Sequence, residues 1–217
     1  MIAALPPPIV AGELVRLQTR QHVVALTFDG GGNADAAKTV LAVLRREHVT
    51  GTFFLTGHFV KTYPALARAI GRRYPVGNHT VNHLDLRRLP SSGVVDEITR
   101  AETMIHAATG QTTQPYFRFP YGARDARTLR IVHQLGYASV RWTVDTLGWM
   151  GRSFQSAGGA VRRILAGLVP GEIVMMHLGS SRDHSTIDAH ALPAAIRMVR
   201  ARGYRFVTLA GVRAPSR

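Results

Sequence analysis

Cysteine is absent from this 217-residue chain, which excludes disulfide bonds and thiolate metal ligands. Any bound metal must therefore be held by His, Asp, Glu or water. Lysine is scarce too, because only Lys38 and Lys61 stand among the 27 basic residues. No apolar run reaches the length of about 18 residues that a membrane helix needs, so we expect no transmembrane segment.

Acidic residues are few relative to basic ones, and the formal net charge is +14. The excess of arginine fits a bias in genomic base composition. It also predicts attraction to polyanions such as nucleic acid, a membrane surface or an anionic cell wall. The arginines are spread along the chain without the aromatic-basic motif of a nucleic-acid reader, so we expect no nucleic-acid partner.

We interpret residues 1–20 as an N-terminal extension and residues 21–212 as one domain, since 46% hydrophobic residues suffice for a single core. Met1–Val10 is proline-rich and lacks the basic region of an intact signal peptide. We therefore expect either a cytoplasmic protein or an exported one whose leader is missing. We expect a monomer.

Apolar, β-rich segments alternate with segments of helical spacing along the whole chain. The predicted strands cover residues 23–28, 52–56, 116–119, 137–144, 172–176 and 204–209. The predicted helices cover residues 34–47, 59–72, 91–109, 125–135, 160–168 and 191–202, with caps expected at Ser91 or Ser92, Gly110 and Asp125. This alternation predicts the α/β class: about seven mostly parallel strands, closed or nearly closed into a barrel with outer helices.

His79 and His83 stand four residues apart after a glycine-bearing turn. On one helical turn, residues at this spacing face the same way, and both imidazoles can reach one ion. A catalytic zinc usually takes three protein ligands and leaves one position open for water. The pair therefore predicts two ligands of a divalent metal, with zinc as the expected ion, unless both histidines are structural.

Polar residues directly follow several predicted strands: Asp29, the segment 118–121, Asp145 and His177. The active sites of barrel enzymes gather at the C-terminal ends of the strands. We therefore expect these strand ends to meet the histidine pair.

Five blocks of sequence stand in order at these positions: Thr27-Phe28-Asp29-Gly30-Gly31, His79-Thr80-Val81-Asn82-His83, Arg118-Phe119-Pro120-Tyr121, Asp145-Thr146-Leu147-Gly148-Trp149 and Met175-Met176-His177. Together they resemble the polysaccharide deacetylase family (carbohydrate esterase family 4). Members of that family are metal-dependent and remove N-acetyl groups from chitin, peptidoglycan and related glycans. The resemblance runs over nearly the whole chain and implies a distorted (β/α) barrel, with the domain 21–212 as its catalytic domain.

Two positions depart from the family's pattern. Most members carry a second aspartate in the first block, as a metal ligand, where this chain has Gly30. Many also carry an aspartate directly before the tryptophan of the fourth block, where this chain has Gly148. A subgroup that includes some peptidoglycan muramic-acid deacetylases also lacks the second aspartate, and the chain resembles this subgroup most.

The resemblance implies that Asp29 is the general base that takes a proton from metal-bound water, and that Arg118 orients it. Asp29 is also a candidate metal ligand beside His79 and His83, as are Asp35 and water. The alternative for Asp29 is a helix cap or turn former. For Arg118 it is an ordinary surface arginine.

His177 is implied as the general acid that protonates the departing amine, and a core histidine is the alternative. Asp145 is expected to support His177 or to bind sugar hydroxyls. Pro120 and Tyr121 are expected to contact the substrate, with the Tyr121 N–H near a developing oxyanion.

Trp149 and Leu178 are expected to form apolar walls for the acetyl methyl group or the sugar face. Asp183, His184 and Asp188 are interpreted as a polar loop that covers or contacts the substrate. A second metal site at this loop is the alternative.

These features predict metal-assisted hydrolysis of an acetamide on a glycan of peptidoglycan or chitin type, with release of acetate. One rival is hydrolysis of another amide or ester by the same site, such as a cyclic imide or acetylated xylan. The other is an inactive glycan-binding domain that lost its metal with the second aspartate. We expect an extracellular or cell-wall-associated protein, with a cytoplasmic location as the alternative.

Overall fold

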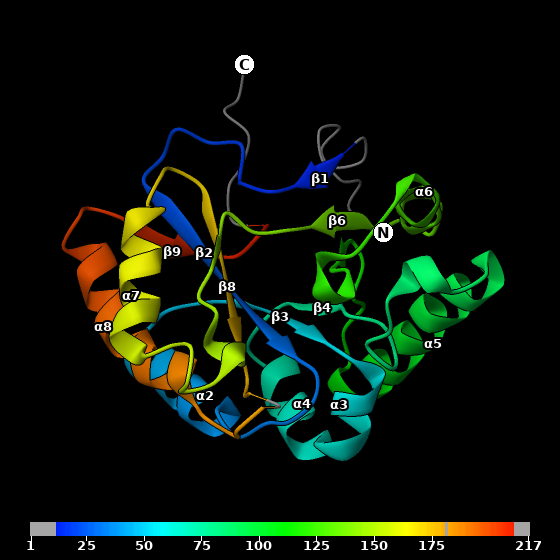
Figure 1. Ribbon diagram of the computed structural model, residues 1–217, viewed down its shortest axis with the longest axis horizontal. Helices are drawn as coiled ribbons and strands as arrows, with labels where there is room; N and C mark the ends of the chain where they lie inside the picture. Colours follow the sequence, from blue (N-terminus) through cyan, green and yellow to red (C-terminus); the bar gives the residue numbers. More distant parts are fainter. Residues whose placement is uncertain (1–11, 181, 211–217) are drawn as a thin grey trace.

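The apolar run that starts at Val23 forms the central strand of the fold. The computed structural model describes residues 12–180 and 182–210, and in it this run lies in β2 (Val23–Gly30), all of whose residues are buried. β2 pairs in parallel with β3 (Thr52–Leu55), β8 (Glu172–His177) and β9 (Arg205–Val207). It is therefore the strand around which the sheet is built (Figure 1).

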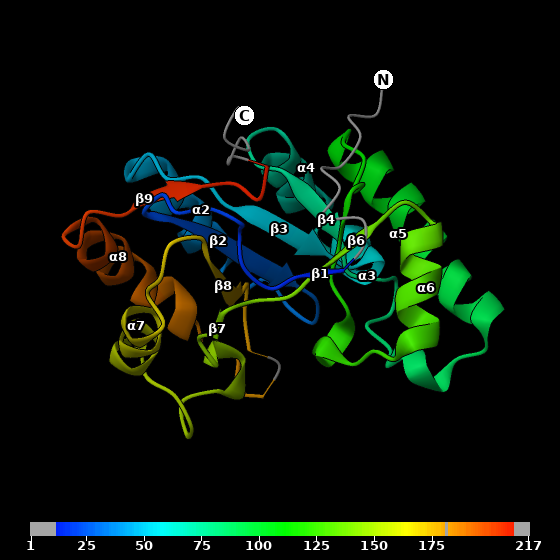
Figure 2. The ribbon, with the colours of Figure 1, turned by 90° about the horizontal axis from the view of Figure 1, so that it is seen from above.

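The sheet has nine strands among the described residues, and they pair in parallel in the order β1-β6-β5-β4-β3-β2-β8-β7, with β9 beside β2. The strands not yet given are β1 (Glu13–Leu14), β4 (Val76–Asn78), β5 (Tyr116–Phe117), β6 (Ala138–Val140) and β7 (Val144–Asp145). The sheet curls into a half-barrel, which Figure 2 shows from above. The predicted distorted barrel of parallel strands with outer helices is confirmed.

Three strands were not foreseen as such. β4 was not predicted, and β1 lies in the expected N-terminal extension but pairs with β6, so the sheet begins before residue 21. The strand predicted over 137–144 is divided into β6 and β7, because the chain between them crosses from one edge of the sheet to the other. Arg141 N donates to the Leu14 carbonyl, whereas Thr143 N donates to that of Ile173. Residues 211 and 212 of the predicted domain lie outside the described residues.

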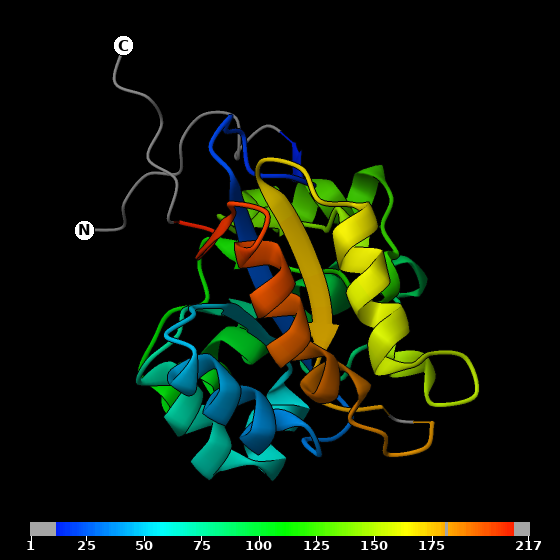
Figure 3. The same ribbon diagram turned by 90° about the vertical axis from the view of Figure 1, so that its left-hand side faces the viewer.

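Helices cover the outer face of the sheet in two groups. Beside β2 and β8 lie α2 (Ala37–Arg46), α7 (Ala157–Ala166) and α8 (Ile187–Arg200), which Figure 3 shows face on. The other half carries α3 (Gly57–Thr62), α4 (Pro64–Gly71), α5 (Ser91–Thr109) and α6 (Ala126–Gln134). Three 3-10 turns complete the set: η1 (Leu86–Arg88), η2 (Pro120–Gly122) and η3 (Gly148–Met150). None of the helices described is long and apolar enough to cross a membrane.

Most helix ends follow the sequence signals. Gly110, in left-handed conformation, ends α5, and Asp125 caps α6 through a capping box, both as predicted. The helix expected over 59–72 is two helices, because Pro64 has no N–H to continue α3 and starts α4 instead. The cap expected at Ser91 or Ser92 is wrong, because both serines lie inside α5 and Pro90 precedes it without a side-chain cap.

Alternation along β2 brings polar groups into the barrel. Its outward residues pack under the helices, while Val23 and Ala25 belong to the inner apolar cluster. Thr27 and Asp29 continue the inward row. The interior thus changes from apolar to polar toward the C-terminal ends of the strands.

Candidate active site

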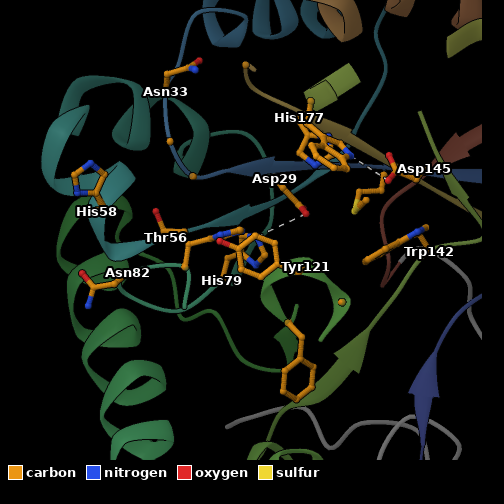
Figure 4. A pocket seen from close by; sticks show the side chains of 18 of the residues that line it. Asp29, Asn33, Thr56, His58, His79, Asn82, Tyr121, Trp142, Asp145 and His177 are labelled. Atoms are coloured by element: carbon orange, nitrogen blue, oxygen red, sulfur yellow. Dashed lines mark hydrogen bonds and ion pairs between the residues drawn. The ribbon is translucent and has the colours of Figure 1, made fainter. Parts of the chain in front are cut away.

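A pocket of about 730 Å³ opens at the C-terminal ends of the strands, a size typical of small-molecule sites. Predicted residues from five separate blocks line it: Asp29, His79, His83, Tyr121, Asp145, Trp149 and His177. Figure 4 shows Asp29 pointing toward His79 at its centre. The expected convergence of strand ends with the histidine pair is therefore present.

Asp29 is held by a fully buried arginine. Arg118 Nη1 donates to Asp29 Oδ1 at 2.6 Å and to Thr27 Oγ1 at 2.9 Å. The other guanidinium N–H groups reach the carbonyl oxygens of Val140 and Arg141 at 3.2 and 3.1 Å. Burial alone would raise the pKa of Asp29, but the Arg118 cation outweighs it and brings this pKa below its ordinary value. The carboxylate is therefore ionised, and Arg118 lies behind the pocket rather than on its wall.

His79 and His83 lie on a loop and not on the helical turn that we expected. Thr80 (φ 67°) and His83 (φ 58°) have left-handed backbone, which a helix does not contain. The loop is fixed by Thr80 Oγ1, which accepts from His83 N at 3.0 Å, and by the buried Glu97 of α5. Glu97 Oε2 accepts from two successive N–H groups of the loop at 3.1 and 2.9 Å. The two rings still meet edge to face, with centroids 4.7 Å apart.

Both imidazoles of this loop are in the neutral form that binds metals. Burial lowers the pKa of His79, and burial together with His79 lowers the pKa of His83 to about 3. His79 Nδ1 donates to the Arg118 carbonyl oxygen at 2.8 Å, because a carbonyl can only accept. Its Nε2 therefore carries the lone pair, 3.8 Å from Asp29 Oδ2. A backbone acceptor on one ring nitrogen is the usual way to orient the other toward a metal.

The histidine pair alone does not complete a metal centre. Over residues 12–180 and 182–210, no group of three or more His, Cys, Asp or Glu side chains is arranged to hold an ion. Gly30 stands where most members of the resembled family carry a second aspartate. A Cβ at this position would lie 2.9 Å from Leu55 Cδ2 and 3.2 Å from Leu178 Cδ1. That space is apolar and not a vacated ligand position. The donors that remain, two imidazoles beside Asp29, suit a divalent metal by type, with solvent as a further ligand.

His177 ends β8 and is paired with a carboxylate from the next helix. Asp188 lies in the first turn of α8. Its Oδ2 accepts from the His177 backbone N–H at 2.7 Å and lies 3.7 Å from the ring nitrogen Nδ1 of the same histidine. Burial lowers the pKa of His177, but the carboxylates of Asp188 and Asp29 outweigh it, so the pKa lies above its ordinary value. The interpretation of Asp188 as part of an exposed polar loop is wrong, since it is buried at the start of α8.

Asp145 organises Trp149 rather than His177. Its Oδ1 accepts from Leu147 N at 2.7 Å, and its Oδ2 accepts from Trp149 Nε1 at 3.2 Å. The Trp149 ring lines the pocket with its centroid 6.5 Å from that of His177. Asp145 makes no hydrogen bond to His177, and its influence on that ring is through its charge, which helps to raise the His177 pKa.

The expected substrate-contacting residues divide into two groups. Tyr121 is 72% exposed at the pocket, and its ring meets His83 edge-on at 4.6 Å. Pro120 is buried and does not line the pocket. Leu178 is fully buried in the core beneath the helices, because it points away from the side to which His177 points. Trp142, which we did not predict, provides an aromatic wall instead (Figure 4).

Other pocket residues also escaped sequence reasoning. His58 and Arg182, to which no role was assigned, line the pocket. Asp35, a candidate ligand, pairs with His184 at 2.9 Å and does not line it. Glu97, which supports the loop of His79 and His83 without lining the pocket, carried a usable signal: it lies at helical spacing from apolar residues of α5 and therefore on the buried face.

Left-handed backbone is concentrated around the pocket. Of the described non-glycine residues with positive φ, five border the loops of the site: Thr80, His83, Tyr121, Leu147 and His184. Each such conformation costs about 1–3 kcal/mol and is typical of functional sites, where the surrounding structure enforces it. The strain is consistent with side chains placed for chemistry rather than for stability.

Known proteins are similar to this chain in sequence and in fold. Residues 16–140 match the family model for polysaccharide deacetylase. The chain is 32% identical over 192 residues to the peptidoglycan-N-acetylmuramic acid deacetylase PdaA of Bacillus subtilis (strain 168), which covers 88% of this chain and 71% of that protein. The solved structure of B. subtilis PdaA, a family 4 carbohydrate esterase, superposes with a TM-score of 0.83 at 30% identity, covering 91% of this chain and 82% of that one.

Two further relatives differ in their described activity. A chitooligosaccharide deacetylase of Azorhizobium caulinodans is 29% identical over 179 residues, covering 82% of this chain and 84% of that protein. BA3943 of Bacillus anthracis, described as a CE4 family pseudoenzyme, superposes with a TM-score of 0.84 at 26% identity, covering 97% of this chain and 72% of that one.

Proposed function

The chain belongs to the polysaccharide deacetylase family, and on that basis we propose that it hydrolyses N-acetyl groups on an amino-sugar polymer of peptidoglycan or chitin type. One observation carries the proposal. The pocket joins an ionised carboxylate (Asp29), two neutral imidazoles (His79 and His83) and a histidine–carboxylate pair (His177 and Asp188). Amide hydrolysis needs a base for water and an acid for the departing amine, and both are available here.

Asp29 acts as the base in this proposal. Arg118 engages Oδ1 and keeps the carboxylate ionised, so Oδ2 is the oxygen left to take a proton from water. Because Arg118 is itself fixed by Thr27 and two carbonyl oxygens, the base has one orientation. Such fixed geometry is what proton transfer requires.

His177 acts as the acid. The carboxylates of Asp188 and Asp29 raise its pKa and so favour the protonated ring, which stands beside Asp29 on the adjacent strand. The proton is given to the amine nitrogen as the amide bond breaks, which leaves acetate and a free amino sugar. The Tyr121 backbone is proposed to help stabilise the oxyanion.

We assign a divalent metal to His79 and His83, with zinc as the ion that best suits the ligands. Asp29 or solvent supplies the remaining coordination in this assignment, since Gly30 offers none. When bound, the metal supplies Lewis-acid activation of water and of the amide carbonyl. The two histidines contribute neutral ring nitrogens, one of them held in place by the Arg118 carbonyl.

Aromatic walls at the pocket suit a sugar ring, which stacks on flat apolar faces. Trp142, Trp149 and Tyr121 provide them. Arg182 lies over Trp149, at 5.8 Å from the ring centroid, and adds positive charge at the same wall. Together with the net charge of +14, this favours an anionic cell-wall glycan, as does the similarity to PdaA. We also propose that the chain belongs to the subgroup without the second aspartate. We propose that the protein acts outside the cell, at the wall.

A second candidate function is an inactive glycan-binding domain. Gly30 in place of a ligand favours it, as does the similarity to the pseudoenzyme BA3943. Hydrolysis of another acetyl ester or amide by the same residues is the remaining alternative.

Acetate release separates these functions. The purified chain would be loaded with zinc, its metal content measured, and acetate quantified from peptidoglycan, chitin oligomers and acetylxylan. We expect one bound metal per chain and acetate from an amino-sugar polymer. His79→Ala and His83→Ala should lose both metal and activity, while His106→Ala, on the exposed side of α5, should keep them. Glycan binding without metal or acetate would instead support the binding domain, and preference for acetylxylan would refute the substrate class.

A further inference from the structure

Gly148 and Asp188 occupy one shared space beside His177. A Cβ built on Gly148 would lie 2.5 Å from the carboxyl carbon and from both carboxyl oxygens of Asp188. Real Cβ atoms do not approach other atoms so closely. The Gly148 backbone has no positive φ that would by itself demand glycine. The missing side chain at 148 is therefore explained by the Asp188 carboxyl group, which fills its place.

Asp188 is built into the site and not exposed at a helix end. Its side chain is 3% exposed, although most aspartates in a first helical turn face solvent. Its Oδ2 accepts from the backbone N–H of His177 at 2.7 Å. Oδ1 and His177 Nδ1 are both buried, and neither has a hydrogen-bond partner among the described residues. A buried carboxylate and a buried ring nitrogen without partners are costly unless they serve each other.

Other charged groups near His177 are already engaged. Asp145 accepts from Leu147 and Trp149, and Asp29 is paired with Arg118. Asp188 Oδ2 lies 3.7 Å from His177 Nδ1, and contacts of this kind are often long in a site without substrate and shorten when the substrate binds. Asp188 is thus the carboxylate available to this imidazole.

We propose that Asp188 is the positioning residue of His177, and that it takes over from α8 the space that a side chain at position 148 would occupy. Asp188 holds the Nδ1–H of His177, which aims Nε2 into the pocket. Asp188 of α8 and Gly148 of η3 therefore form one unit: a carboxylate fits from position 188 or from position 148, but not from both. This inference rests on the proposed role of His177 as the acid.

A carboxylate exchange tests the unit. Asp188→Ala removes the carboxyl group. Asp188→Asn keeps an oxygen that can accept from the His177 backbone N–H but removes the negative charge. Gly148→Asp introduces a second carboxyl group into the occupied space. The double variant Gly148→Asp/Asp188→Ala moves the carboxylate from the helix to the loop.

We expect Asp188→Ala and Asp188→Asn to lower kcat about 10- to 100-fold with little change in KM, as for other carboxylates that orient a functional histidine. Gly148→Asp alone should also lose activity and unfold at lower temperature, because its Cβ overlaps Asp188. The double variant should recover most of the lost kcat. A double variant no more active than Asp188→Ala, or a fully active Gly148→Asp, would overturn the proposal.

A second readout does not depend on turnover. In nitrogen-15 NMR of histidine-labelled protein, at a pH high enough for the His177 ring to be neutral, the wild-type chain should show the remaining ring proton fixed on Nδ1. Asp188→Ala should lose this preference, and the double variant should restore it. If the wild-type chain released no acetate but kept this pattern, the proposed function would fail while the positioning role held. If all variants showed the same ring state, the positioning role would fail.

Discussion

Glu172 gives the sharpest test of the energetics of the fold. It begins β8, its side chain is fully buried, and neither carboxyl oxygen has a hydrogen-bond partner among the described residues. Burial raises the pKa of Glu172 from 4.5 to about 8. The folded chain therefore holds a proton on Glu172 between these pH values, whereas the unfolded chain does not.

The direction of the pH dependence follows from proton binding. Between pH 4.5 and about 8 the unfolded state binds one proton fewer, so this group makes the protein less stable as pH rises. The contribution of Glu172 to stability is fully present below pH 4.5, and it is lost as the pH rises through the folded-state pKa of about 8. At 1.36 kcal/mol for each pKa unit, the free energy of unfolding should fall by about 5 kcal/mol over the window, as an order of magnitude.

Glu172→Gln removes the titration while it keeps the shape of the side chain. Urea unfolding of wild type and variant between pH 5 and 9 measures the difference. We expect similar stabilities near pH 5 and a variant that becomes progressively more stable than wild type toward pH 8. Asp96→Asn, at an exposed site on α5, should track the wild type over the same range. Parallel curves for wild type and Glu172→Gln would refute the reasoning.

Three further experiments, two of them with a matched comparison variant, test the supports of the site and the fit of the core. Arg118→Met should lower the free energy of unfolding by about 3–5 kcal/mol in urea titrations, since it leaves the Asp29 charge buried without its partner; an unchanged midpoint would contradict this. Glu97→Ala should weaken zinc binding in calorimetric titrations, because the loop of His79 and His83 loses its acceptor, while Glu97→Gln keeps one acceptor oxygen and should bind more tightly than Glu97→Ala. Gly77→Ala should lower the free energy of unfolding by about 1–3 kcal/mol, because its Cβ would lie 2.6 Å from Phe54 Cε1 and 3.1 Å from the Tyr116 carbonyl oxygen. Gly158→Ala, with open space in α7, should raise stability by about 0.5–1 kcal/mol, and equal effects at the two glycines would argue against the packing described.

Sequence reasoning succeeds here where the signal is local. The apolar run of β2 and the polar residue that ends it sufficed to place Asp29, because strand ends of a parallel barrel meet at one face. Gly110 and Asp125 ended and began their helices as expected, since caps act within a few residues.

Contacts between distant segments were beyond the sequence. Nothing near Gly148 indicates that Asp188, on another element, fills its space. The loop of His79 and His83 was taken for a helical turn, because its left-handed residues are not glycines and are stabilised from α5 by Glu97. Leu178 was expected at the substrate, but the turn of the chain after His177 directs it into the core.

Asp29→Asn tests the central claim most directly. The change keeps the size of the side chain and removes the charge that the proposed base needs, while the proposed metal ligands His79 and His83 are unchanged. The measurement is acetate release from peptidoglycan or chitin oligomers by zinc-loaded wild type and variant, with the zinc content of both. The account predicts that the variant binds zinc and releases no acetate. Loss of zinc would make Asp29 a ligand instead, and wild-type acetate release by the variant would contradict its role altogether.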